Sequence, residues 1–105
     1  MEAVEEIEDR IAHVVENPGR RAAALAQQRE IHQAARDFFR AVEDHRNHVR
    51  RLNLDFGTSG YAYDRAASKL VEKQLASSER IIRAAMEMRR TLTREDWEAL
   101  KGDRR

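Results

Sequence analysis

The residues best suited to chemistry in this chain are a carboxylate and two imidazoles, Asp44, His45 and His48. Asp44 and His48 are four residues apart, so on a helix they lie on adjacent turns of one face, with His45 between them. Neutral imidazole and carboxylate are ligands for Zn²⁺, Ni²⁺ and Cu²⁺. The spacing predicts a divalent transition-metal site completed by another helix or a second chain. The competing interpretation is structural, with His45 in a helix–helix contact and His48 paired to Asp44.

Residues that would support enzymatic catalysis form no recognisable pattern. Cysteine is absent, and Ser59, Ser77 and Ser78 have no histidine at a helical or hairpin spacing that suggests a triad. The sequence contains no HExxH or ExxH motif, and Gly57 and Gly60 belong to a turn rather than to a phosphate-binding loop. We therefore predict that the protein is not an enzyme.

The charged residues predict a solvated helical surface rather than a nucleic-acid site. The 105 residues include 20 Lys or Arg and 19 Asp or Glu, which gives a formal net charge of +1. Basic residues crowd segments 46–51 and 65–73, but acidic residues are interleaved with them, and only Tyr61 and Tyr63 are available to stack on a base. This pattern is typical of an ion-paired helix face. No apolar run approaches the roughly 18 residues of a membrane span, so no span is predicted.

Long helices must position these side chains, because the chain contains few breakers. One proline and four glycines are too few turn signals for a β-sandwich or barrel. Asn17 and Pro18 suit the start of a helix, and Thr93 followed three residues later by Asp96 is close to a capping box. We predict a single all-α domain, residues 1–105, with helices at about 3–16, 18–55, 60–91 and 94–101.

The second predicted helix carries an apolar seam with heptad spacing, and the break after it reverses the chain. Its residues alternate steps of three and four: Ile31, Ala35, Phe38, Val42, His45, Val49, Leu52 and Phe56. The break at 57–60 predicts an antiparallel hairpin in which residues whose numbers sum to about 117 face each other. That register places Val42 opposite Leu75 and Ile31 opposite Met86.

A hairpin of this length is too thin to bury its own apolar faces. At about 1.5 Å per residue the second helix would be roughly 55 Å long, and the first helix is too short to cover it. We therefore predict an antiparallel homodimer with a four-helix section near the turn. A surface for unfolded clients or for a partner helix would use an apolar set, namely Phe38, Val42, Val49, Leu52, Met86 and Met88.

The segment Leu92–Leu100, LTREDWEAL, follows a long Arg-rich helix and resembles the LTxxQ ending of Spy/CpxP-type periplasmic proteins, with Asp96 at the position of the glutamine. That group includes envelope-stress chaperones and the related CnrX/ZraP-type metal-resistance and metal-sensing proteins. The resemblance implies a long bent helical hairpin with short end helices, association as a dimer and a periplasmic location. It also implies a non-enzymatic role as a chaperone or metal-responsive sensor.

The first residues of the chain favour another location. Segment 1–5 is acidic and lacks the basic and apolar parts of a signal peptide. Taken alone, this feature predicts a cytoplasmic location. The alternative hypothesis is therefore a cytoplasmic dimeric adaptor or structural module whose seam binds a helix of a partner protein.

Overall fold

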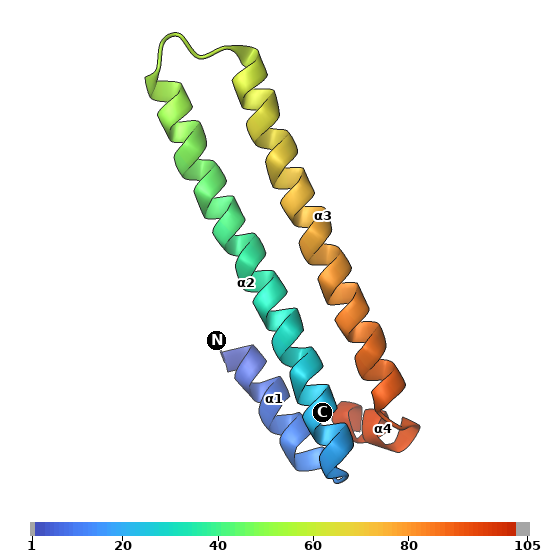
Figure 1. The fold of residues 1–105 in the computed structure, drawn as a ribbon. Helices are drawn as coiled ribbons and strands as arrows, with labels where there is room; N and C mark the ends of the chain where they lie inside the picture. Colours follow the sequence, from blue (N-terminus) through green and yellow to red (C-terminus); the bar gives the residue numbers. More distant parts are fainter. Residues whose placement is uncertain (1, 103–105) are drawn as a thin grey trace.

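The computed structural model describes residues 2–102, with side chains from Glu6 onward, and this part of the chain consists of four α-helices and no strands (Figure 1). The prediction of an all-α fold built on a helical hairpin is confirmed. In chain order the helices are α1 (Glu2–Val14), α2 (Pro18–Leu54), α3 (Gly60–Thr91) and α4 (Arg94–Gly102). No helix in the described residues combines the length and apolarity needed to cross a membrane.

Helices α2 and α3 form an antiparallel hairpin that makes the structure 61 Å long and only about 24 Å wide (Figure 1). Thr58 closes the turn by donating its hydroxyl to the Leu52 carbonyl at 2.8 Å. The hairpin follows the predicted register, since Arg80 bonds Asp37 at 2.7 Å across the two helices. Nearer the turn, Tyr63 donates to Asn53 at 2.6 Å, within one residue of the same register.

Helix α3 buries several small residues against α2, and some of its large apolar residues are exposed instead. Ala66, Ser77 and Ala84 are buried along the hairpin contact. Leu75 and Met86, which the register alone placed opposite Val42 and Ile31, leave 62% and 49% of their surface exposed. The register was therefore predicted correctly, but the rotation of α3 about its own axis was not. Small side chains let two helices approach closely, which favours this rotation.

The core lies at the open end of the hairpin, where α1 packs beside α2 and the short α4 closes the base (Figure 1). Ile11 and Val15 are 1% and 0% exposed, and they pack against Ala24, Met88 and Leu92. The narrow apolar stripe of α1 thus meets residues from both long helices. A helix of only 13 residues is marginally stable in water, so α1 depends on this packing for its helical structure.

A capping box starts α4 and also ties it to α2. Thr93 Oγ1 accepts from the Asp96 amide at 3.1 Å, and Asp96 Oδ2 accepts from the Thr93 amide at 3.2 Å. The same carboxylate oxygen receives the Arg20 Nε–H at 2.8 Å. The Arg20 bond is the main cause that lowers the pKa of Asp96, and the Thr93 bonds add to it. Asp96 therefore caps one helix and joins it to another.

Replacing Asp96 with alanine should lower the free energy of unfolding by about 1–2 kcal/mol at pH 7, because a helix cap and a charge-assisted bond are lost together. The pKa of Asp96 is lower in the folded protein, so its contribution is present above the ordinary aspartate pKa of about 4 and is lost as pH falls through the folded value. Urea unfolding at several pH values should show the difference between wild type and variant shrinking below about pH 4. Glu95→Ala is the control, and an undiminished Asp96 effect at pH 2 would contradict this role.

Candidate functional site

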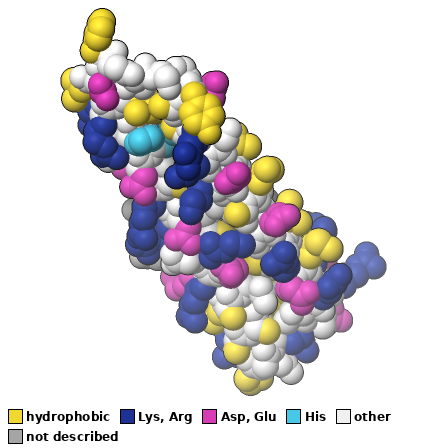
Figure 2. All heavy atoms as spheres, turned by 45° about the horizontal axis from the view of Figure 1, so that its top comes forward, with side chains coloured by type: hydrophobic (Ala, Val, Ile, Leu, Met, Phe, Trp, Pro, Cys, Tyr) yellow, Lys and Arg dark blue, Asp and Glu magenta, His cyan; other side chains and the backbone are white. Residues whose placement is uncertain are grey.

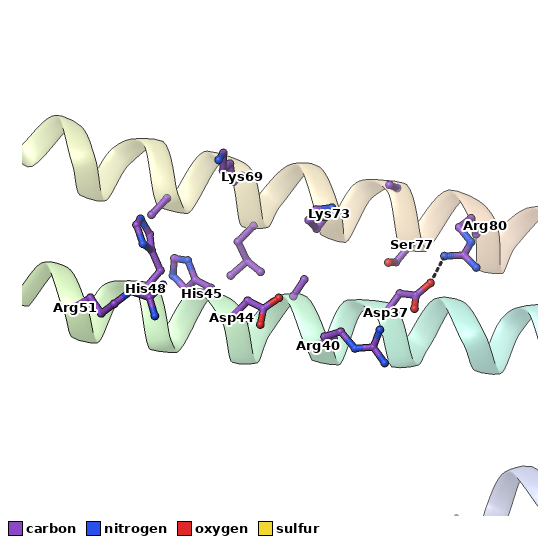
Figure 3. Close-up of a pocket in the computed structure, with 14 residues that line it drawn as sticks. Asp37, Arg40, Asp44, His45, His48, Arg51, Lys69, Lys73, Ser77 and Arg80 are labelled. Atoms are coloured by element: carbon purple, nitrogen blue, oxygen red, sulfur yellow. Dashed lines mark hydrogen bonds and ion pairs between the residues drawn. The ribbon is translucent and has the colours of Figure 1, made fainter.

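A groove runs between α2 and α3 in the half of the hairpin near the turn (Figure 3). Its volume is about 610 Å³. Small residues on both helices, including Ala41, Ala66 and Ala76, leave this space between the two backbones. Polar and charged side chains border it: Asp37, Arg40, Asp44, His45, His48 and Arg51 from α2, and Lys69, Lys73, Ser77 and Arg80 from α3.

The groove carries an excess of positive charge, with five Lys or Arg side chains against two carboxylates. Arg80 is neutralised, since it pairs with both Asp37 and Glu30. Arg80 is also the main cause that holds the pKa of Asp37 below its usual value. Within the described part of the chain, no ion pair engages the other four cations, which are Arg40, Arg51, Lys69 and Lys73. The groove can therefore attract anionic groups.

The predicted metal ligands Asp44, His45 and His48 all border this groove, and both imidazoles project from α2 toward α3 (Figure 3). His45 is half-buried, as its place on the seam predicted, and Asp44 and His48 are exposed. Across residues 2–102 no three His, Asp or Glu side chains are gathered closely enough to hold one ion.

The predicted client or partner residues do not share one surface. Met88 lies in the core and is 7% exposed, whereas Met86, two residues before it, is half-exposed. The remaining four are half-buried along the hairpin contact: Phe38, Val42, Val49 and Leu52. Of the whole set, Met86 is the one most available to another molecule.

A row of exposed apolar residues on α3 was not predicted, and we call Val71, Leu75, Ile82 and Met86 the outer stripe. These side chains are between 49% and 62% exposed. At 3.6 residues per turn they lie about 150° around α3 from the residues that contact α2. Their steps of four, seven and four keep the four side chains on one face of the helix. That periodicity is visible in the sequence, but it does not show which face of α3 lies against α2.

Further large apolar residues stand out at the turn, and we call Leu54, Phe56 and Tyr61 the tip. Their exposed fractions are 83%, 105% and 72%. Figure 2 shows hydrophobic side chains protruding at this end and along one long edge, among charged side chains of both signs. A monomer that leaves so many large apolar groups in water presents surfaces suited to other molecules.

No family model, no curated protein and no solved structure matches this chain. The chemistry of its surfaces is therefore the guide to what it does. The outer stripe could bind the apolar face of a helix. The tip could bind apolar side chains of an unfolded chain, and the groove could bind anionic groups.

Proposed function

We propose that the protein is a non-enzymatic chaperone-type binding protein that works as a dimer, in which two copies pair through the outer stripe and hold unfolded polypeptide at the tip and groove. The observation that carries the proposal is the set of large apolar side chains exposed outside the core. The likeness of segment 92–100 to the Spy/CpxP ending supports the same class of function and an envelope location.

The outer stripe is complementary to itself when two α3 helices run antiparallel. In a pair whose two-fold axis passes between Ser78 and Glu79, Leu75 lies opposite Ile82 of the partner subunit. Val71 likewise lies opposite Met86 of the partner subunit. The small Ser78 allows the helices to approach closely at the two-fold axis. Every large residue of the stripe thus meets another large residue, as an isologous interface requires.

Charge supports the same antiparallel pairing. Glu72 and Arg83 lie on one flank of the outer stripe, and no ion pair engages either of them within the described residues. The pairing brings Glu72 close to Arg83 of the partner subunit at two symmetric places. The stripe spans about 22 Å of α3, so the interface is at the small end for stable complexes, about 1,200 Å² in total. We expect a dissociation constant on the order of 10 μM.

The tip and the groove remain open in this dimer, because they lie away from the outer face of α3. Unfolded segments expose apolar side chains, which suit Phe56 and Tyr61, and carboxylates, which suit the groove cations. Contacts of this kind are adaptable rather than specific, as a protein that holds many different clients requires.

An aggregation assay tests the chaperone proposal. The wild-type protein should suppress aggregation of a denatured client at a near-stoichiometric ratio. The double variant Leu54→Ser, Phe56→Ser should lose most of that suppression, because it removes much of the exposed apolar area of the tip. Phe39→Ser, which removes an exposed aromatic side chain away from the tip, is the control and should remain active. No suppression by the wild type would overturn the proposal.

The outer stripe, a row of exposed apolar side chains on one helix face, also favours a second candidate, an adaptor that binds a helix of another protein. This corresponds to the cytoplasmic alternative. A wild-type chain that stays monomeric and suppresses no aggregation would favour the adaptor, because its stripe would then be free for a partner helix. A metal-responsive form of the dimer would use Asp44, His45 and His48, which border the same groove.

A further inference from the structure

A second cavity lies at the base of the hairpin, between α1, the two long helices and α4, and we call it the basal pocket. Its volume is about 570 Å³, within the range of small-molecule sites. All four helices contribute apolar walls: Ile7, Ile11, Ile31, Met88, Trp97 and Leu100. The pocket is therefore a built part of the core region rather than a gap between two surface helices.

One polar side chain lines this apolar space without a partner. Gln28 is only 7% exposed and borders the basal pocket. No hydrogen bond joins its side-chain amide to another residue in the part of the chain that the structure describes. Its carbonyl oxygen and amide hydrogens can therefore bond a ligand without first breaking a contact within the protein. Gln28 thus offers unused donors and an acceptor to a molecule inside the pocket.

Among the side chains that the structure describes, three cations and no carboxylate border the same pocket. The Arg89 guanidinium lies over the Trp97 ring at 5.3 Å, and Arg10 donates weakly to the Leu100 carbonyl at 3.4 Å. No ion pair engages Arg10, Arg89 or Lys101 within the described residues. Arg89 and Lys101 are exposed, so the positive charge lies on the solvent side of an apolar cavity.

We propose that the basal pocket binds a small anionic amphiphile, a carboxylate with an apolar chain. The apolar walls take the chain, the cations balance the carboxylate, and Gln28 supplies hydrogen bonds. An apolar cavity bordered by three cations and an amide fits this class better than a neutral or cationic molecule. Binding here is separate from the outer stripe, the tip and the groove, so it does not depend on the proposed function.

Trp97 makes the test direct, because it is the single tryptophan of the chain and it borders the pocket. Titration with sodium dodecanoate below its micelle concentration should change the Trp97 emission saturably. Dodecyltrimethylammonium, with the same chain length and the opposite charge, should bind at least about tenfold more weakly. Equal binding of the two probes, or no saturable change with dodecanoate, would overturn the proposal.

Variants separate the pocket from general electrostatic attraction. The double variant Arg10→Gln, Lys101→Gln should weaken dodecanoate binding about tenfold or more, and Gln28→Leu should also weaken it severalfold. Lys69→Gln, Lys73→Gln removes the same charge from the groove and should leave the affinity unchanged. Equal losses in the two double variants would contradict a specific site. The Arg10 and Lys101 changes leave the apolar walls intact, so the test stands even if Gln28→Leu does not fold.

Discussion

Replacing Ile11 with alanine should lower the free energy of unfolding by about 2–4 kcal/mol, because the change leaves a cavity in the middle of the small core. Ile11 is 1% exposed and packs with Val15, Met88 and Leu92. Since α1 is too short to be stable alone, its loss of packing should also release it from the hairpin. Urea unfolding followed by circular dichroism measures the change.

Ile7→Ala is the matched control for this prediction, since it makes the same substitution one turn earlier on the same helix. Ile7 is 43% exposed, so its replacement should cost less than about 1 kcal/mol. Equal destabilisation by the two variants would show that α1 does not pack in the orientation described here.

Introducing glutamate at Leu75 and Ile82 together should weaken self-association by at least about 100-fold, because four carboxylates would be buried in one small interface. Sedimentation equilibrium across micromolar concentrations measures this, with the 12.2 kDa chain as the monomer reference. The fold should be kept, since both side chains are more than half exposed and lie outside the core. Leu54→Glu, at an even more exposed apolar position in the tip, is the control. A double variant that associates as strongly as the wild type would remove the outer stripe from the interface.

The fold could be predicted largely because its signals are local. Asn17 and Pro18 mark the start of α2, and the Asn17 side chain does accept the Arg20 amide at 2.9 Å. Thr93 and Asp96 form the capping box that their spacing indicated. The antiparallel register follows from a short turn between two long helices, whatever those helices pack against.

The rotation of α3 could not be predicted, because this helix carries two sets of residues with helical spacing on nearly opposite faces. One set is small and includes Ala66 and Ser77, and the other is large and includes Leu75 and Ile82. Hydrophobicity alone favours burying the large set. The structure buries the small set, because small side chains let the two backbones approach and bring many atoms into contact.

The two cavities depend on residues that the sequence keeps far apart. The groove joins positions near 40 and 75, and its charge balance depends on the pairing of Arg80 with Asp37 and Glu30 across the two helices. Asp44, His45 and His48 were recognised as a group from their spacing, but the cations beside them belong to another helix. The basal pocket needs all four helices, so no local pattern reveals it.

The proposed pairing of two α3 helices is tested most directly by a single cysteine. The natural chain has none, so Ser78→Cys places one thiol near the proposed two-fold axis. Mild oxidation should convert this variant to a covalent dimer of twice the 12.2 kDa chain mass, because the two thiols lie close to each other. Ser77→Cys, one residue away but buried against α2, should stay monomeric under the same conditions. A Ser78→Cys protein that forms no disulfide, or no more than Ser77→Cys, would contradict the proposed dimer.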